Sequence, residues 1–343
     1  MKALVLEEYN KLVYKDVPKP EYQTNEVLVR VKACGICGSD VHGIDGSSGR
    51  RIPPIIMGHE ASGIIEEVGR EVTNWKPGDR ITFDSTIYPL NDWYTLKGMY
   101  NLSEDRKVLG VSPGDYHQNG AFAEYVVVPE HILYLLPDEV SFEQAAMVEP
   151  VAVASHAIRL TPLELQDTVA VIGTGMIGLF LIQMLKQSHA GNIIAIDIDD
   201  RKLELARQFG AAHVLNSGNN NVLEDIYGIT QNRGADVVFE AVGIEDTINS
   251  AIEIVRKGGT VTLVGNLSAK VNFPLQSVVT RQIRIQGSCA IAGEYSLVLD
   301  MMQKGLLDIE PLLSACAPLS EGADWFDRLY RKEPGLNKVI LIP

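Results

Sequence analysis

The chain has 343 residues, 46% of them hydrophobic and 22% charged, which is typical of globular proteins and enough for two domains. The formal net charge of -14 disfavours nucleic acid and anionic membranes as partners, since both need a basic face. With no signal-peptide pattern, no apolar run of membrane-spanning length and only four cysteines, the sequence predicts a cytoplasmic protein.

Residues 1 to about 150 predict mostly short strands punctuated by turns rich in Gly, Pro and Asp. Short strands at this spacing indicate a barrel-like β domain. The runs that carry the prediction are EVLVRVKA, ASGIIEEVG, DRITF and AFAEYVVVP.

From about residue 153 the pattern changes to strands that alternate with helices, which predicts a doubly wound parallel sheet. The segment 246–259 is expected to be the helix between two of these strands. After about residue 293 a further helix, YSLVLDMMQKGLL, leads to a last strand, KVILIP.

A glycine-rich motif joins the first of these strands, VAVI, to an amphipathic helix. This context supports dinucleotide binding, because the free N–H groups and the dipole at the start of a helix favour a pyrophosphate. The motif consists of Gly173, Thr174, Gly175, Met176, Ile177 and Gly178.

Asp197 ends the next strand, at the place where a carboxylate accepts hydrogen bonds from the adenosine ribose and repels a 2′-phosphate. It therefore predicts NAD rather than NADP; the alternative is a helix-start acid with no ligand role. Arg201 is placed to contact a phosphate, but Asp199 and Asp200 beside it favour NAD.

Four residues form a candidate metal site: Cys37, His59, Glu60 and Glu149. A thiolate, a neutral imidazole and one or two carboxylates suit Zn²⁺ with an open position for substrate. Glu149 lies in an apolar stretch, where an unpaired carboxylate is costly. Singly, each has a structural alternative: a core cysteine, a structural histidine, a capping or ion-paired Glu60, and a helix-start Glu149.

The motifs together resemble the zinc-dependent medium-chain dehydrogenase family. The similar segments are CGICGSDVH, GHEASGIIEEVG, KPGDRI, GAFAEY, the EP at 149–150, and GTGMIG with Asp197, in family order. The resemblance implies a GroES-like β-barrel catalytic domain over 1–153 and 293–343 and a Rossmann NAD-binding domain over 154–292. It also implies a catalytic zinc, hydride transfer between an alcohol carbon and NAD, and a homodimer or homotetramer.

The resemblance also assigns roles to residues. Cys37 and His59 match zinc ligands, and Glu60 matches the adjacent acid. Glu149 stands where simple alcohol dehydrogenases carry a cysteine, a pattern similar to that of polyol and sugar-alcohol dehydrogenases. Three protein ligands plus water are expected, with the two glutamates able to exchange roles, so which of them is the third ligand stays open.

Further matches concern the proton path and the cofactor. Ser39 and His42 match a proton relay, and Asp40 matches the carboxylate that orients the zinc-bound histidine. Lys202 matches a contact to the cofactor ribose. The residues that match the lining of the nicotinamide pocket are Val242, Val264 and Ser288.

One segment departs from the family. Many members hold a second, structural zinc with four cysteines in a lobe after the GDRI strand, but here the corresponding positions are Asn91, Tyr94, Lys97 and Asp105. One zinc per chain is therefore expected. The lobe is aromatic instead (Tyr88, Trp93, Tyr94 and Tyr100): we expect these rings to pack the lobe, the alternative being that one of them stacks on a sugar-like substrate.

The pattern favours a polyol, a sugar alcohol or a cyclitol as substrate and leaves open which one. Arg50 and Arg51 precede the ligand pair and are expected to form a solvated basic turn; if they instead hold a phosphate, the substrate is a phosphorylated polyol. Two other classes are less favoured: a zinc-free reductase of the same superfamily, and a non-enzymatic redox or zinc module built on Cys34 and Cys37.

Overall fold

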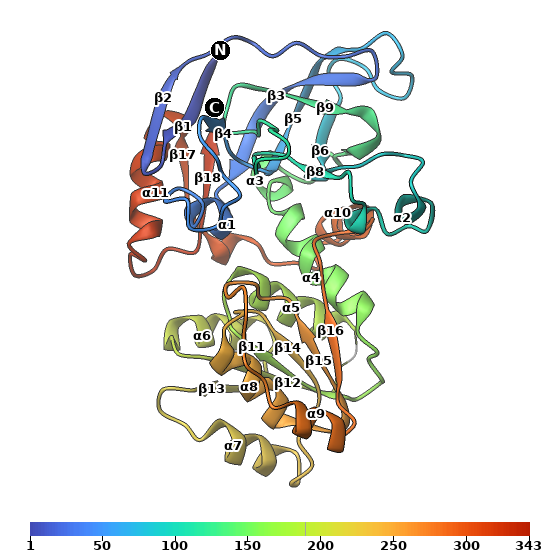
Figure 1. The fold of residues 1–343 in the computed structure, drawn as a ribbon, viewed down its shortest axis with the longest axis vertical. Coiled ribbons are helices and arrows are strands. Elements are labelled where there is room, and N and C mark those ends of the chain that lie inside the picture. The colour runs from blue at the N-terminus through green and yellow to red at the C-terminus, as the bar shows by residue number, and fades with distance from the viewer. Residues whose placement is uncertain (189) are drawn as a thin grey trace. The chain divides into compact units, whose positions relative to one another are not determined.

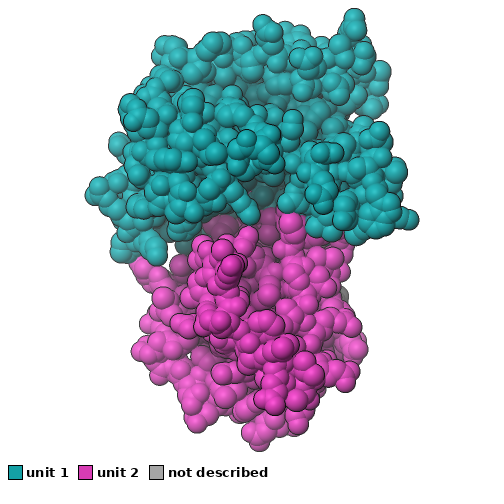
Figure 2. Space-filling model, in the orientation of Figure 1, with its two compact units in different colours: residues 1–149, 291–305, 309–343 teal, residues 150–290, 306–308 magenta. Residues whose placement is uncertain are grey.

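The computed structural model describes residues 1–188 and 190–343. The chain divides into two compact units, coloured separately in Figure 2. Unit 1 comprises residues 1–149, 291–305 and 309–343, and unit 2 comprises residues 150–290 and 306–308. The short return 306–308 belongs to unit 2 because Gln183 exchanges two hydrogen bonds with the backbone of Asp308, at 2.8 and 2.9 Å.

Unit 1 is built on sheets whose strands pair antiparallel, except for the parallel pair of β17 and β18 (Figure 1). A seven-stranded sheet has the order β10-β6-β5-β3-β18-β17, with β9 also paired to β3, and smaller sheets are β2-β1-β4 and β7-β8. The strands are β1 (Lys2–Glu8), β2 (Lys11–Asp16), β3 (Glu26–Gly35), β4 (Ile55–Ile56), β5 (Glu60–Val68), β6 (Arg80–Phe83), β7 (Thr86–Ile87), β8 (Lys107–Val108), β9 (Tyr125–Pro129), β10 (Leu133–Leu135), β17 (Leu313–Pro318) and β18 (Lys338–Ile342).

The core of unit 1 lies between these sheets. β3 is buried over most of its length because it pairs with β5, β9 and β18. Phe122 and Phe326 meet edge to face in this core, with ring centroids 5.6 Å apart. Since β18 ends the chain, the C-terminal segment completes the sheet that the N-terminal segment begins.

Short helices connect the strands of unit 1, and α10 and α11 lie in its C-terminal segments. The helices are α1 (Gly38–Val41), α2 (Trp93–Leu96), α3 (Phe142–Ala145), α10 (Tyr295–Gln303) and α11 (Gly322–Tyr330), with 3₁₀ turns η1 (Tyr100–Leu102), η2 (Glu130–Ile132), η3 (Glu310–Leu312) and η4 (Leu319–Glu321).

Unit 2 is the expected doubly wound sheet. Six parallel strands have the order β13-β12-β11-β14-β15-β16, so the order reverses between the neighbouring strands β11 and β14. The strands are β11 (Thr168–Ile172), β12 (Asn192–Asp197), β13 (His213–Asn216), β14 (Ala235–Glu240), β15 (Val255–Leu263) and β16 (Arg284–Gly287). Ligands of such sheets bind at the carboxyl ends of strands beside this reversal.

Helices follow the strands of unit 2. They are α4 (Val148–Leu160), which begins at the end of unit 1's first segment, α5 (Met176–Gln187), α6 (Asp200–Phe209), α7 (Val222–Ile229), α8 (Glu245–Ile254) and α9 (Leu275–Thr280). Among the described residues, no helix is both long and apolar enough to cross a bilayer.

The expected helix over 246–259 is too long, because α8 ends at Ile254 and β15 begins at Val255. Val255 is β-branched, which favours a strand, and it pairs with Ala235 on β14 before the register shifts. The neighbouring Arg256 donates to Asp236 on β14 over 2.6 Å, which ties this segment to the sheet.

Candidate metal centre and dinucleotide site

Three of the four expected metal ligands come together in unit 1. Cys37 is the residue before α1, and His59 and Glu60 lie at the start of β5. Their candidate ligand atoms all lie within 4.8 Å of one another. Gly35 at the end of β3 pairs with Glu60 at the start of β5. This pairing brings the loop that carries Cys37 beside His59 and Glu60.

The sulfur of Cys37 accepts two hydrogen bonds from Ser39. The backbone N–H donates over 3.4 Å and the hydroxyl over 3.3 Å. A cysteine binds metals as its thiolate. Cys34, by contrast, is fully buried, and burial raises the pKa of its thiol well above the ordinary value. The two cysteines are free thiols, and a Cys34–Cys37 redox site is not supported.

His59 is buried beside a carboxylate, as expected. Its Nδ1 lies 3.5 Å from Oδ1 of Asp40, which is fully buried. Burial alone would lower the pKa of His59, but Asp40 and Cys37 raise it well above its ordinary value. Burial alone would raise the pKa of Asp40, but His59 and Arg51 hold it at about 2. Asp40 is therefore ionised and available to orient the imidazole.

The expectation of a solvated basic turn is wrong for Arg51. Its side chain is only 3% exposed and donates to Asp40 Oδ1 from Nη2 over 2.9 Å and from Nε over 3.3 Å. A buried carboxylate needs such a partner, and the interior of unit 1 supplies it. Arg50 is exposed.

Glu60 also has a buried cationic partner, Lys338 at the start of β18. The ammonium donates to Glu60 Oε2 and to the carbonyl oxygen of Ile36, the latter over 3.1 Å. Burial alone would lower the pKa of Lys338, but Glu60 and Cys37 raise it. Sequence reasoning missed this lysine, because a lysine at the start of an apolar strand carries no sign of a distant partner.

Glu149 lies at the start of α4 and is half-buried. It is not part of the group of ligand atoms within 4.8 Å of one another. Burial raises its pKa to about 7, Glu60 adds to the rise, and His59 and Lys338 oppose it. The charges of the cluster therefore act on the Glu149 carboxyl group. Glu60 lies closer to Cys37 and His59, so it is the better placed candidate for the third ligand.

The donor set fits a zinc ion in both chemistry and charge. A thiolate, an imidazole and a carboxylate are zinc donors. When ionised, Cys37, Glu60, Glu149 and Asp40 carry four negative charges, against two positive charges on the buried Arg51 and Lys338. A divalent cation among these donors would bring the group to neutrality, as burial requires.

The two residues expected to carry protons lie on α1 and at its end. Ser39 is exposed; its hydroxyl donates to Cys37 and accepts from Arg51 over 3.3 Å. His42 caps the helix and is exposed.

In the cysteine-free lobe, Tyr88 and Tyr100 stack with ring centroids 4.0 Å apart, and His131 meets Tyr88 edge to face at 4.8 Å. The Tyr100 hydroxyl donates to the buried Asp84 over 2.6 Å. These rings therefore pack the lobe, whereas Trp93 is 63% exposed.

The glycine motif of unit 2 has the geometry that the sequence predicts. Gly175 precedes α5 with no side-chain cap on the helix, so N–H groups at this helix start are free for an anion. A side chain at Gly178 would collide with the carbonyl oxygen of Gly173, so only glycine allows this close approach of helix and loop. Thr174 is fully buried between them.

Asp197 ends β12 and organises the same loop. Its Oδ2 accepts from the amide and hydroxyl of Thr174 over 2.7 and 3.0 Å, and its Oδ1 from the amides of Ile198 and Asp199 over 2.7 and 3.0 Å. Arg201 is held by Asp199 through two side-chain contacts of 3.2 and 2.9 Å. A phosphate would have to compete with Asp199 for this arginine.

The other expected cofactor residues also lie at the carboxyl edge of the sheet. Val242, Val264 and Ser288 each follow the end of a strand: β14, β15 and β16. The buried Glu240 fixes the first of these turns by accepting from the amides of Val242 and Gly243. Lys202 lies in the first turn of α6, after Asp197.

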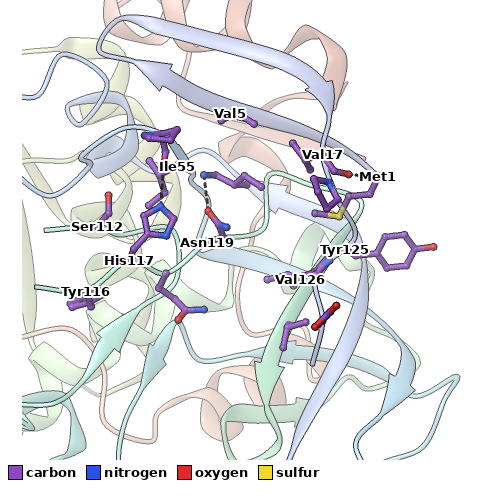
Figure 3. A pocket seen from close by; sticks show the side chains of 18 of the residues that line it. Met1, Val5, Val17, Ile55, Ser112, Tyr116, His117, Asn119, Tyr125 and Val126 are labelled. Carbon is purple, nitrogen blue, oxygen red and sulfur yellow. Dashed lines mark hydrogen bonds between the residues drawn. The ribbon is translucent and has the colours of Figure 1, made fainter. Parts of the chain in front are cut away.

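A separate hollow of about 1130 Å³ opens in unit 1 beside the N-terminus (Figure 3). Three of its polar side chains are already engaged: His117 Nε2 lies 2.9 Å from the Pro54 carbonyl oxygen, Asn119 accepts from the Ile56 amide, and Tyr116 accepts from the Val108 amide. None of the described residues that line it belongs to the metal cluster. The hollow is therefore not the candidate site.

A zinc-type donor set in one unit and a dinucleotide-binding sheet in the other define the class: a metal-dependent dehydrogenase. Comparison with known proteins agrees. Residues 23–138 match the alcohol dehydrogenase GroES-like domain, and residues 177–304 match the zinc-binding dehydrogenase family. The chain belongs to the zinc-binding dehydrogenase family and is an oxidoreductase. This confirms the expected family and the GroES-like plus Rossmann architecture.

Two relatives and one solved structure illustrate the similarity. Sorbitol dehydrogenase of Bacillus subtilis (strain 168) is 33% identical over 348 residues, covering 100% of this chain and 97% of its own. D-arabitol-phosphate dehydrogenase of Enterococcus avium is 34% identical over 326 residues, covering 94% and 91%. A zinc-binding dehydrogenase from Sinorhizobium meliloti 1021 bound to NADP is 31% identical, with a TM-score of 0.91 and coverage of 100% and 99%.

Proposed function

We propose that the protein transfers a hydride between a secondary alcohol of a polyol, sugar alcohol or cyclitol and NAD. The observation that carries the proposal is the Cys37–His59–Glu60 donor set, with Glu149 near it in place of a further thiol. Relatives named as polyol dehydrogenases support the substrate class. The acidic Asp197 and the pairing of Arg201 with Asp199 support NAD over NADP.

Each residue of the site has a role in this proposal. Cys37, His59 and one of the two glutamates would hold zinc, which when bound supplies a Lewis acid toward the substrate oxygen. As the Ser39 hydroxyl takes up the substrate proton, it gives up its own proton toward His42, whose exposure allows release to water. Asp197 and Lys202 bind the cofactor ribose, and Val242, Val264 and Ser288 line the nicotinamide.

The test is the formation of NADH by the zinc-loaded enzyme on a panel of free polyols, sugar alcohols and cyclitols. Cys37→Ser and His59→Ala should abolish turnover, while NADH binding to unit 2 persists. Turnover retained by the metal-free enzyme would contradict the proposal. The metal content should be one zinc per chain, and two zinc ions would contradict the assignment of the aromatic lobe.

A phosphorylated polyol is the second candidate substrate, because one relative is named D-arabitol-phosphate dehydrogenase. Arg51 is already paired with Asp40, so Arg50 is the exposed residue of the pair that can meet a phosphate. If the substrate is phosphorylated, Arg50→Ala should raise the KM for the phosphorylated polyol at least tenfold and leave that for the free polyol unchanged. Equal effects on both would reject this alternative.

We also propose a cytoplasmic homodimer or homotetramer. Cys34, Cys37 and Cys316 are free thiols, which suits a reducing compartment. The edge strand β16 and the helix α9 before it carry exposed apolar side chains that a second copy would cover.

A further inference from the structure

The residues around Arg51 hold its side chain in the interior of unit 1. Its backbone is fixed on both sides by Ser112, whose amide donates to the carbonyl oxygen of Arg50 over 3.0 Å and whose carbonyl accepts from the Ile52 amide over 3.1 Å. The side chain then passes Gly43, where a Cβ would lie 2.5 Å from Cγ of Arg51. The absence of a side chain at Gly43 leaves room for the arginine stem.

The guanidinium contacts two different parts of the candidate site. Nε and Nη2 donate to Oδ1 of Asp40, the same oxygen that faces Nδ1 of His59. Nη2 also donates to the hydroxyl oxygen of Ser39 over 3.3 Å. Oδ2 of Asp40 is buried and has no partner among the described residues, so this carboxylate is stabilised at Oδ1, which faces both Arg51 and His59.

Two consequences follow for the chemistry. Because Asp40 orients His59, a group that fixes Asp40 also fixes the imidazole and with it the affinity for metal. A guanidinium only donates, so the Ser39 hydroxyl must accept from it and point its own proton elsewhere, here to the Cys37 sulfur. Arg51 therefore occupies one acceptor position of the Ser39 hydroxyl and leaves the Ser39 proton for a different acceptor.

We propose that Arg51 is a positioning residue that joins the metal-binding side of the site, through Asp40 and His59, to the proton-carrying hydroxyl of Ser39. The inference rests on the proposed function for its link to turnover, but its link to metal binding stands by itself. It also explains why an arginine beside a turn is buried: its Nε and Nη2 donate to Asp40 and Ser39.

The test compares Arg51→Met, Arg51→Lys and the double variant Arg51→Met/Asp40→Asn with the parent enzyme. Arg70→Met is the matched control, because the side chain of Arg70 is 81% exposed in the same unit. Four quantities are measured: zinc affinity by competition with a chromophoric chelator, the thiolate charge-transfer spectrum of the cobalt-loaded protein, kcat and KM on the best polyol, and thermal unfolding.

Arg51→Met should weaken zinc binding about 10- to 100-fold and alter the cobalt spectrum, as expected when a group that orients a metal-bound histidine is lost. Its kcat at saturating zinc should fall further than KM changes, because the Ser39 hydroxyl is no longer directed. Arg51→Lys should restore part of the zinc affinity but little of kcat, since one ammonium does not reproduce the guanidinium fork. Arg70→Met should match the parent.

The double variant separates positioning from folding. It lacks the unpaired buried carboxylate, so it should unfold near the parent temperature while zinc affinity and kcat stay low. If Arg51→Met only lowers the unfolding temperature, with parental zinc affinity, cobalt spectrum and kcat, the inference is overturned. If the parent oxidises no polyol, the proposed function fails, whereas zinc affinity and the cobalt spectrum still decide the role of Arg51.

Discussion

At the scale of single residues, the metal cluster is a problem of buried charge. Glu60 is 1% exposed and Lys338 is 3% exposed, and their ion pair lies beside the groups that would hold zinc. Lysine and metal therefore act on the same carboxylate. Removing one member of a buried ion pair leaves the other uncompensated, which costs several kcal/mol.

This arrangement predicts the effect of Lys338→Met. The metal-free variant should lose about 3–5 kcal/mol in the free energy of unfolding of unit 1, because Glu60 is left buried without its cation. Zinc then supplies the missing charge, so added zinc should stabilise the variant more than the parent. Urea unfolding with and without zinc measures both effects. Lys304→Met is the control, since that ammonium is 60% exposed; an equal zinc effect in parent and variant would contradict the prediction.

The carboxylate of Asp197 leads to a prediction about the cofactor. The substitution Asp197→Asn retains the shape of the side chain and part of its contacts to Thr174. It removes the negative charge, which strengthens hydrogen bonds to the ribose and repels a 2′-phosphate. The Kd for NADH should rise roughly 10- to 100-fold, and the Kd for NADPH should rise less or fall. Titration of cofactor fluorescence measures both. Asp246→Asn, an exposed acid in the same unit, should change neither.

The ligand residues could be predicted from the sequence because each sits in a short local motif, whereas their partners could not. Lys338 meets a carboxylate 278 positions earlier in the chain, and Arg51 lies in a basic turn that looks solvated. Pairings of this kind depend on how strands and loops pack, which no local pattern reports. A buried acid needs a cationic partner, but the sequence does not show which lysine or arginine that partner is.

At the scale of elements, the lobe after β6 contains a buried acid among aromatic rings. Asp84 is 1% exposed, and burial raises its pKa to about 6, although the Tyr100 hydroxyl and the Thr86 amide oppose the rise. The folded protein therefore keeps a proton on Asp84 that the unfolded chain has released. Stability must then fall as the pH rises from about 4 to about 6.

The contribution of Asp84 to this fall is on the order of 3 kcal/mol, from its shift of about two pKa units. Asp84→Asn should lack it, so the difference in the free energy of unfolding between parent and variant should change by that amount between pH 4 and 7 and then level off. Urea unfolding at several pH values measures the difference, in which the titration of other groups cancels. Parallel curves for parent and variant would contradict the role of Asp84.

Elements of unit 2 were easier to predict than those of unit 1. Each buried parallel strand is a compact apolar run followed by an amphipathic helix, so the alternation is visible in the residues. The boundary between α8 and β15 was the exception, because 255–259 carries charged and glycine residues and its strand pairing is irregular. In unit 1, no sequence motif predicts the hairpin of β1 and β2 or the helix α11.

At the scale of the whole molecule, both units are assembled from separate stretches of chain. The C-terminal strand β18 pairs with β3 and brings Lys338 to the cluster that Cys37 and Glu60 begin. The last strand therefore takes part in the site. Sequence order reveals the two fold types but not this closure, since β18 reads only as an apolar strand.

The open edge of unit 2 leads to a prediction about the proposed association of two copies of the chain. The edge strand β16 pairs only with β15 among the described residues, and exposed apolar side chains lie on it and on α9: Val279 is 68% exposed, Leu275 63% and Ile285 37%. An open edge with an apolar face favours pairing with a second copy about a twofold axis.

The Val279→Asp/Ile285→Arg variant should shift the species observed by light scattering from at least a dimer toward a monomer. Leu165→Asp, at a leucine 74% exposed elsewhere in unit 2, should leave the mass unchanged. Because a monomer would still contain the metal cluster of unit 1, its zinc affinity should equal that of the parent, and a loss of zinc together with the dimer would mean that the edge also supports the site.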